Sequence, residues 1–315
     1  MIDYKVSITT KLKPPQKGII VIEPEDYTRA EVKALRDSDA KVLAYLSIGS
    51  ISDEREYYGA YKKYALKRLE NWPHERYLDL RIPKVREWCV NRALMLRRMG
   101  FDGLWLDNVD IYEEYRTTEM FNAIVNTLMA IKAIRGYVMI NGGSLFLTDL
   151  MIPHKVQLGA YKNEKNAKKM ATALKKKGFN ATTIEMDDLQ KVQAGAFSSQ
   201  ENADNLVEKL HAAGFGSAKR ITLYAGKPAA CIDGVTQEEV FSLITNYKGK
   251  GKFTKQTREE SERYQAHMRR IVKNGLQGFL LEYVDKDDNT LRLRIKTFCE
   301  VAGMTGCCIS ADKDL

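Results

Sequence analysis

A 25-residue segment occurs twice in this chain, at an offset of 36 residues. The first copy, residues 155–179, reads KVQLGAYKNEKNAKKMATALKKKGF, and the second, residues 191–215, reads KVQAGAFSSQENADNLVEKLHAAGF. Repetition at a fixed spacing marks a duplicated structural unit, but two copies are too few for a solenoid. The repeat therefore predicts a small domain with internal two-fold symmetry, which separates the rest of the chain into two pieces.

Both copies follow the same local pattern. An alternating run, residues 156–161 in the first copy, is typical of a strand. Apolar residues at spacings of three and four over residues 167–174 predict a helix, and Gly178 suits its C-terminus. Second strands are expected at Ala181–Met186 and Ala218–Tyr224. The order β-α-β-β-α-β predicts an α+β domain of the ferredoxin-like type.

The duplicated motif VQxGA[YF]…NA…L…GF resembles the SPOR (sporulation-related repeat) domain over residues 153–224. The resemblance implies binding to bacterial peptidoglycan, typically to glycan strands stripped of their stem peptides. It assigns glycan binding to Gln157 on the first strand and to Lys191 at the start of the third. The alternative is an RNA-binding or regulatory domain of the same topology. The aromatic residues of an RNA-recognition sheet are missing, so we expect no nucleic-acid partner.

The repeated region is also the most basic part of the chain. The net charge is +9, and residues 153–224 contain twelve Lys and Arg against seven Asp and Glu. A basic module favours an anionic polymer such as a cell-wall polymer, a nucleic acid or an acidic polysaccharide. A solvated lysine-rich helix face accounts for much of the same charge, so charge alone does not choose between these partners.

Composition excludes several classes of protein. No run of eighteen apolar residues exists, so we expect no membrane span. The N-terminus lacks the charged-then-apolar pattern of a signal peptide, so either a leader was trimmed or release is of the phage type. An extracellular or cell-wall-associated location follows from the resemblance. The five cysteines are scattered without metal-ligand spacing, so we expect neither a structural metal nor a cofactor.

Removal of the insert leaves about 243 residues, close to the usual size of a (β/α)8 barrel. We therefore expect residues 1–152 and 225–315 to form an α/β barrel of the TIM type, with 153–224 inserted after its sixth strand. Buried parallel strands read as short apolar runs. Eight such runs are Tyr4–Ile8, Gly18–Ile22, Val42–Ile48, Arg76–Leu80, Gly103–Asp107, Tyr137–Ile140, Ala229–Val235 and Gly278–Tyr283.

Acidic residues follow the ends of several of these strands, on the face where barrel enzymes carry their sites. They are Asp79, Asp107, Asp110, Glu238, Glu239 and Glu282. Glycoside hydrolysis needs one carboxylic acid that stays protonated and one carboxylate that stays ionised. A single acid at a strand end is often only a helix N-cap, whereas acids at the ends of several strands indicate a shared site.

The segments AYLSIGSISDEREYY, GFDGLWLDNVDIYEEY, MINGGS, IDGVTQEEVFS and FLLEYV look like the glycoside hydrolases related to endo-α-1,4-polygalactosaminidase, family 114. The resemblance implies a (β/α)8 fold that cleaves α-1,4-linked galactosamine-type glycans. It places the catalytic acids at Asp107 and Glu238, with Glu239 as the neighbouring alternative. Relatives often have Glu where this chain has Ser50, so we expect that acid to shift to Asp53 or Glu54.

Other residues near the strand ends are candidates for substrate binding. They are Arg55, Asp79, Asp110, Tyr112, Asn141, Glu239, Glu282 and Tyr283. Asn141 starts an Asn-Gly-Gly turn that suits either sugar hydroxyls or a tight bend. Tyr45 and Trp105 alternate within apolar strands and are expected in the core.

Taken together, these features predict a cell-wall-directed glycoside hydrolase that cleaves an amino-sugar polysaccharide and is tethered to peptidoglycan glycan strands. Tethering raises the local substrate concentration without changing the chemistry. Two alternatives stay open. One is a phage or prophage endolysin that cuts peptidoglycan itself, and the other is a non-catalytic protein that binds wall glycan.

Overall fold

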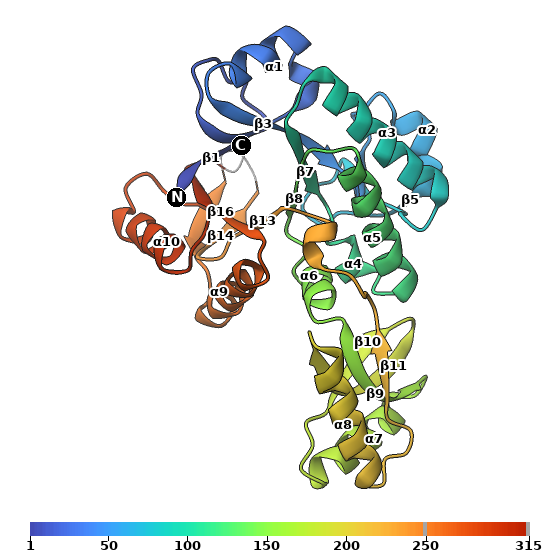
Figure 1. The fold of residues 1–315 in the computed structure, drawn as a ribbon. Coiled ribbons are helices and arrows are strands. Elements are labelled where there is room, and N and C mark those ends of the chain that lie inside the picture. Colours follow the sequence, from blue (N-terminus) through green and yellow to red (C-terminus); the bar gives the residue numbers. More distant parts are fainter. Residues whose placement is uncertain (248–250, 313–315) are drawn as a thin grey trace. The chain divides into compact units, whose positions relative to one another are not determined.

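The computed structural model describes residues 1–247 and 251–312 (Figure 1). The chain divides into two compact units, which we describe separately. The barrel unit comprises Met1–Ile111, Ile124–Gly143 and Ala229–Leu315, and the insert unit comprises Tyr112–Ala123 and Ser144–Pro228. The insert unit therefore contains more than the repeated segment. The boundaries expected from the repeat, residues 153–224, stay a prediction.

A closed barrel of eight parallel strands forms the centre of the barrel unit, which confirms the predicted α/β barrel. In barrel order the strands are β1 (Ile2–Ser7), β2 (Gly18–Ile22), β3 (Ala40–Ser47), β7 (Gly103–Asp107), β8 (Tyr137–Asn141), β13 (Gly234–Glu238), β16 (Gln277–Tyr283) and β17 (Gly306–Ser310). The register pairs Ser47 with Asp107 across β3 and β7. It pairs Glu238 with Leu281 across β13 and β16. The C-terminal strand ends therefore lie at one rim.

One predicted barrel strand, Arg76–Leu80, was wrong. The corresponding strand β6 (Glu75–Leu78) pairs antiparallel with β4 (Ser50–Ser52) and β5 (Ala65–Arg68) in a separate three-stranded sheet. The missing barrel strand is β17, which lies between β16 and β1. Its residues after Gly306 are only half-buried, so it does not read as an apolar run.

Because β6 lies outside the barrel and β17 belongs to it, the barrel strands that carry the acids have different numbers from those predicted. Asp107 ends the fourth barrel strand, Glu238 ends the sixth, and Glu282 lies on the seventh. The insert follows the fifth strand, not the sixth, because β8 precedes it and β13 follows it. The predicted run Ala229–Val235 begins too early, since β13 starts at Gly234.

The barrel interior is filled by large side chains with one polar contact at its centre. Tyr4, Trp105, Met139 and Phe279 belong to one buried cluster. The Trp105 indole N–H lies 3.0 Å from both the Tyr4 hydroxyl and Thr236 Oγ1, so these buried polar groups have partners. Trp105 is thus a core residue, as predicted.

Helices follow most barrel strands. They are α1 (Arg29–Arg36), α2 (Tyr58–Tyr61), α3 (Pro83–Met99), α4 (Ile111–Glu114), α5 (Thr118–Ala133), α6 (Ser144–Met151), α9 (Arg258–Lys273) and α10 (Asn289–Val301). Short 3-10 turns cover Pro24–Asp26, Lys62–Tyr64 and Pro228–Ala230, and β14 (Ser242–Asn246) pairs with β15 (Lys252–Lys255). Across the described ranges, no helix has both the length and the apolar character needed to cross a membrane.

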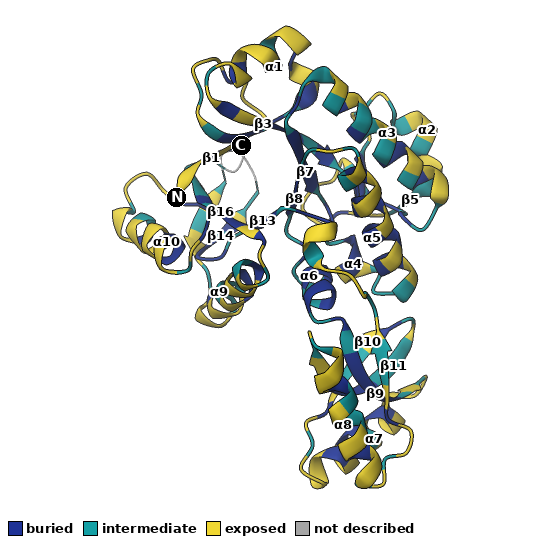
Figure 2. Cartoon of the chain, viewed as in Figure 1, coloured by how far each residue is buried: buried dark blue, intermediate teal, exposed yellow. Residues whose placement is uncertain are grey.

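The repeated segment folds as predicted, in the order β9 (His154–Tyr161), α7 (Glu164–Lys176), β10 (Thr182–Met186), β11 (Leu189–Phe197), α8 (Gln200–Ala212) and β12 (Lys219–Thr222). Its antiparallel sheet has the order β10-β11-β9-β12. Both helices pack on one face of this sheet through a core that includes Val156, Val192, Leu174 and Leu210. Figure 2 shows exposed residues along the outer sides of α7 and α8 and buried residues along β9.

Packing explains why the two copies share their sequence. A Cβ atom at Gly159 would lie 2.7 Å from the Tyr161 ring, and one at Gly195 would lie 2.9 Å from the Phe197 ring. The GA[YF] motif therefore leaves space for its own aromatic side chain. Phe179 and Phe215, which end the two copies, meet edge-on with ring centroids 6.1 Å apart.

The two ends of the repeated domain lie side by side. The Leu223 N–H donates to the Pro153 carbonyl at 3.0 Å, and Thr222 on β12 is the register partner of His154 on β9. A domain whose ends meet in this way can be inserted at a single point of a host chain.

Candidate active site

Two carboxylates stand at the C-terminal ends of two barrel strands that are separated by one other strand. Asp107 is the last residue of β7 and Glu238 is the last residue of β13, and both side chains are partly buried. β8 lies between these two strands in the barrel and ends at Asn141. The rim therefore presents an acid, an amide and a second acid on three adjacent strands.

Asn141 connects the two acids through a single atom. Its Nδ2 donates to Asp107 Oδ1 at 3.1 Å and to Glu238 Oε1 at 2.6 Å. These two oxygens are therefore at most about 5.7 Å apart, the sum of the two bond lengths, which is close to the carboxyl separation of about 5–5.5 Å in retaining glycosidases. Inverting enzymes keep their carboxyl groups at roughly 6.5–9.5 Å to admit a water molecule.

A tyrosine binds the remaining oxygen of each acid. The Tyr45 hydroxyl donates to Asp107 Oδ2 at 3.2 Å, and the Tyr283 hydroxyl donates to Glu238 Oε2 at 2.7 Å. Each carboxylate is thus held by Asn141 on one side and by a phenol on the other. This arrangement fixes both side chains before any substrate arrives.

The surroundings of the two acids raise both pKa values, to different extents. Burial, together with the charge of Asp107, raises the pKa of Glu238 to about 7, against the opposing bond from Tyr283. Burial also raises the pKa of Asp107, while bonds from Asn141, the Asn108 main chain and Tyr45 lower it. Near neutral pH, Glu238 is the group that can hold a proton. Two acids with separated pKa values can divide into an acid and a base.

Asn108, next to Asp107, has an unusual backbone that the neighbouring loop accommodates. Its φ of 62° lies in the left-handed region, and a Cβ at Gly49 would come within 1.8 Å of its carbonyl oxygen. Its side-chain nitrogen donates at 3.0 Å to both Ser47 Oγ and Ser50 Oγ. The YLSIG and LDN segments are therefore matched parts of one turn that sets the position of Asp107.

A cavity of about 260 Å³ opens beside this turn. Its lining includes Glu23, Tyr45, Ser50, Glu54, Arg55 and Glu75. Ser50 Oγ donates to Glu75 Oε2, so Glu75 is the carboxylate beside Ser50. We had expected Asp53 or Glu54 in that place. Burial raises the pKa of Glu75, and the charge of Asp107 contributes.

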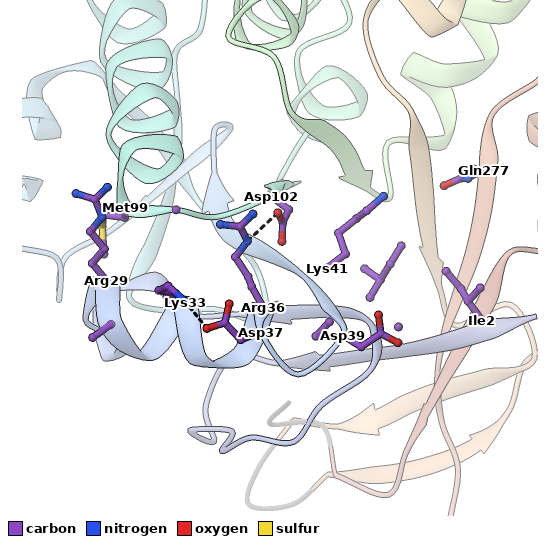
Figure 3. A pocket seen from close by; sticks show the side chains of 15 residues that line it. Ile2, Arg29, Lys33, Arg36, Asp37, Asp39, Lys41, Met99, Asp102 and Gln277 are labelled. Carbon is purple, nitrogen blue, oxygen red and sulfur yellow. Dashed lines mark hydrogen bonds and ion pairs between the residues drawn. The ribbon is translucent and has the colours of Figure 1, made fainter.

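A larger cavity of about 990 Å³ lies at the other end of the barrel strands (Figure 3). It is lined by residues that precede or begin the strands, such as Gly18, Ala40, Asp102 and Gln277. Arg36 pairs with Asp102 and Lys33 with Asp37 along its wall. Parallel barrels carry their chemistry at the C-terminal rim, so this cavity is separate from the two acids.

Glu282 and Tyr112 are not placed to bind a substrate. Glu282 is fully buried and accepts main-chain N–H bonds from Val240, Phe241 and Ser242. Tyr112 is fully buried in the insert unit, where its hydroxyl donates to Asp149 at 2.9 Å. Both residues are structural because of this burial, which a single sequence does not reveal.

The other predicted binding residues are held mainly by neighbouring groups. Asp79 accepts from the Arg81 guanidinium at 2.8 Å, and Arg55 binds Glu23 and Glu25, both at 2.7 Å. The carboxylate of Glu239 accepts the Ile244 N–H. Asp110 is half-buried, three residues after Asp107. Tyr283 is buried and stacks on Phe253, with centroids 5.9 Å apart, so it contributes its hydroxyl to the site.

Three features of the site were missed by the sequence analysis. Tyr45 was expected in the core, yet its hydroxyl reaches Asp107. Glu75 was not a candidate, because it directly precedes the run Arg76–Leu80 that was predicted as a barrel strand. The third is Trp72, which is 44% exposed and meets Tyr247 edge-on, with ring centroids 6.1 Å apart. Burial raises the pKa of Tyr247, and the charges of Glu239 and Glu238 raise it further, which places Tyr247 near the two acids. An exposed tryptophan in a turn is the one signal that could have identified this aromatic edge.

In the insert unit, the two residues predicted to bind glycan are both engaged or covered. Gln157 is 9% exposed. Lys191 forms an ion pair with Asp187, and the side chain of Lys191 is 13% exposed. These positions belong to the sheet face that α7 and α8 leave uncovered, since the helices pack on Val156 and Val192.

Two family models match the chain. Residues 3–139 match glycoside-hydrolase family GH114, and residues 152–220 match the SPOR domain. No curated protein matches the chain.

Solved structures share the fold of the whole chain. The glycoside hydrolase domain of PelA from Pseudomonas aeruginosa has a TM-score of 0.62 at 14% identity, covering 99% of this chain and 96% of that domain. Ega3 from Aspergillus fumigatus, solved in complex with galactosamine, has a TM-score of 0.56 at 14% identity, with coverages of 98% and 90%. At these identities the likeness establishes the shared fold.

Proposed function

We propose that this protein, whose residues 3–139 match the GH114 family and residues 152–220 the SPOR domain, is a glycosidase that hydrolyses an amino-sugar polysaccharide while bound to peptidoglycan. The observation that carries the catalytic part is the pair Asp107 and Glu238 bridged by one nitrogen of Asn141. A short separation favours direct attack by one carboxylate over the wider arrangement in which an inverting enzyme holds a water beside the sugar, so we infer a retaining reaction with a covalent intermediate.

In this reaction Glu238 is the general acid and Asp107 is the nucleophile. Glu238 gives its proton to the glycosidic oxygen as that oxygen leaves, and an Asp107 oxygen forms the new bond to the anomeric carbon. Glu238, now ionised, then takes a proton from water. The resulting hydroxide attacks the anomeric carbon, and the bond to Asp107 breaks. The assignment of Glu238 as the acid follows from its pKa of about 7, raised by burial and by the charge of Asp107.

The acidic cavity beside the catalytic pair supports an amino-sugar substrate. Glu54 and Glu75 both line it, whereas Arg55 is committed to Glu23 and Glu25. Excess negative charge in a partly closed site attracts a cation such as a protonated amine. The complex of the structural relative Ega3 with galactosamine agrees with this substrate class.

The test is to incubate the purified protein with partly deacetylated galactosamine polymer, with its fully acetylated form and with purified peptidoglycan, and to measure new reducing ends. We expect cleavage of the deacetylated polymer, with the first product in the configuration of the substrate by NMR. Cleavage of peptidoglycan alone would favour the endolysin alternative. An inverted first product would contradict the proposed mechanism.

Two substitutions test the assigned acids. Asp107→Asn and Glu238→Gln should each lower kcat by at least about 100-fold, because each removes a group that takes part in bond breaking. Glu239→Gln is the matched control, since its carboxylate accepts the Ile244 N–H instead of facing Asn141. Circular dichroism should show all three variants folded. If Glu239→Gln is inactive and Glu238→Gln is active, the second acid is misassigned.

A further inference from the structure

Polar side chains on the face of the SPOR sheet opposite α7 and α8 are almost completely buried. Strand alternation places Lys155 and Gln157 on β9, and Gln193 on β11, opposite the core residues that contact α7 and α8. In an antiparallel sheet with helices on one side, the second face usually meets water. Here Lys155 is 5%, Gln157 9% and Gln193 7% exposed. Something in the insert unit therefore covers this face.

Helix α6 covers one part of it. Asp149 on α6 accepts Lys155 Nζ at 2.8 Å, and the two side chains are 3% and 6% exposed. The same carboxylate accepts Arg116 Nη2 at 3.1 Å and the Tyr112 hydroxyl at 2.9 Å. A buried carboxylate with three charged or polar donors is satisfied in this arrangement. Loss of any one partner leaves a buried charge with less compensation.

The turn between β10 and β11 holds residues 116–118. Asp187 accepts the Thr118 N–H at 2.6 Å and the Thr118 hydroxyl at 2.9 Å, while its own N–H donates to the Arg116 carbonyl at 3.1 Å. Asp187 therefore caps the first turn of α5 from outside the helix. Lys191 completes this contact through its ion pair with Asp187.

The equivalent lysines of the two repeats, Lys155 and Lys191, thus each form an ion pair with an aspartate of the insert unit. Lys155 binds Asp149, and Lys191 binds Asp187, which in turn binds Thr118. A glycan hydroxyl that approached this face would have to replace contacts already made by the chain itself. The Asp187 contact is the weaker one, because the Asp187 side chain is 33% exposed whereas that of Asp149 is 3% exposed.

We propose that residues 112–123 and helix α6 close the glycan-binding face of the SPOR domain in the free protein, so that peptidoglycan strands bind only after this segment is released. The proposal rests on the wall-binding part of the proposed function. Release at Asp187 comes first, because that contact is partly exposed and involves a turn.

Two neighbouring residues of this turn provide a matched pair of variants. Asp187 and Asp188 have φ values of 56° and 57°, and asparagine is favoured at both positions of such a turn. Asp187→Asn keeps the turn but removes the charge that Lys191 and the start of α5 share. Asp188→Asn makes the same chemical change one residue away, where it leaves the contacts with Thr118 and Lys191 intact.

The experiment compares the full-length parent and both variants in two assays. Hydrogen exchange at the Thr118 and Asp187 amides reports closure directly, without glycan. Sedimentation with glycan strands that lack stem peptides reports binding. We expect Asp187→Asn to exchange faster at both amides and to bind roughly tenfold more tightly, the size expected for one charge-assisted contact. Asp188→Asn should match the parent in both assays.

Other outcomes separate this inference from the proposed function. If Asp187→Asn exchanges no faster than Asp188→Asn, this contact does not close the face and the inference is wrong. A second outcome combines three results: Asp187→Asn exchanges faster, it binds glycan no more tightly than the parent, and Gln157→Ala weakens glycan binding in the parent. The glycan-binding face would then already be accessible in the parent, which would overturn the proposed closure and leave wall binding intact. If the opened variant binds no glycan at all, wall binding itself fails.

Discussion

Asn141 shows how one side chain can set the chemistry of two others. Its amide nitrogen binds an oxygen of Asp107 and an oxygen of Glu238, which keeps two acids close that would repel each other if both were ionised. The nearby negative charge of Asp107 is one cause of the raised Glu238 pKa. The same geometry therefore underlies both the proposed retaining reaction and the raised pKa of Glu238.

The first prediction concerns pH. The pKa of Glu238 is raised to about 7 and the acid must be protonated, so kcat/KM should fall as pH rises through about 7. Tyr283→Phe removes a bond that lowers this pKa and should move the alkaline limb to higher pH. Tyr45→Phe removes a bond that lowers the Asp107 pKa and should move the acidic limb upward instead.

These two phenylalanine variants act as controls for each other, because each removes one hydroxyl from one acid. A shift of the alkaline limb by Tyr45→Phe, with none by Tyr283→Phe, would reverse the acid and nucleophile roles. Profiles measured on a small soluble substrate avoid any contribution from wall binding.

Asp107 and Glu238 were predicted from the resemblance to family 114, and Asn141 was a candidate because it follows the apolar run Tyr137–Ile140. Their catalytic and binding roles stay predictions. The sequence did not identify Tyr45, since a tyrosine within an alternating strand reads the same whether its hydroxyl meets solvent, core or a carboxylate. Glu75 was missed for a related reason. Its contact with Ser50 depends on antiparallel pairing of β4 with β6, which local patterning does not encode.

At the scale of elements, strand β16 carries a buried acid, Glu282, whose role is structural. Glu282 accepts three main-chain N–H groups of the turn after β13, and Ser242 Oγ also donates to it. Burial raises its pKa to about 8 against these bonds. The side chain fixes the start of β14 to the barrel.

Glu282→Gln should therefore lower the free energy of unfolding by about 1–3 kcal/mol, because the Gln amide offers one oxygen to donors that now share two. Urea denaturation at pH 5 and pH 8 measures this loss. The difference in unfolding free energy between parent and variant should be smaller at pH 8 than at pH 5. Between the ordinary pKa of a glutamate and the raised pKa of about 8, Glu282 keeps its proton in the native parent but loses it in the unfolded parent, so the stability of the parent falls as pH rises. Equal stability of parent and variant at pH 5 would contradict this role.

The turn between β5 and β6 offers a different kind of test. Trp72→Ala should raise KM for a long polymer several-fold, equivalent to about 0.5–1.5 kcal/mol of lost aromatic contact, and leave kcat for a small substrate unchanged. Met129→Ala is the matched control, because Met129 on α5 has the same 44% exposure. An unchanged KM for Trp72→Ala would remove this turn from the binding surface.

The errors made at this scale have one cause. β17 was missed because its half-buried residues lack an apolar pattern, and β6 was misplaced because its short run resembles a barrel strand. Which strand closes a barrel is decided by pairing with β1 and β16, far away in the sequence. The repeated domain was easier to predict, because each copy of the repeat shows the same strand and helix pattern in the sequence.

For the whole molecule, the adjacent ends of the repeated domain permit its removal. Splicing at about Ile152 and Ala225 should leave a folded protein that cleaves soluble substrate and no longer sediments with peptidoglycan. Its melting temperature should fall, because Asp149 and Thr118 lose Lys155 and Asp187. Calorimetry and a sedimentation assay measure both effects. A spliced chain that does not fold would show that the repeated domain is required for the barrel.

The shared contacts also have an evolutionary consequence. Asp149 and Arg116 are encoded outside the repeated segment, yet Asp149 meets Lys155 within it. A lineage that lost the repeat would no longer be under selection to keep an acid and an arginine at these two places, and would be free to replace both. Sequences that retain the repeat should inherit Asp149, Arg116 and Lys155 as a set, which a survey of descendants with and without the repeat can decide.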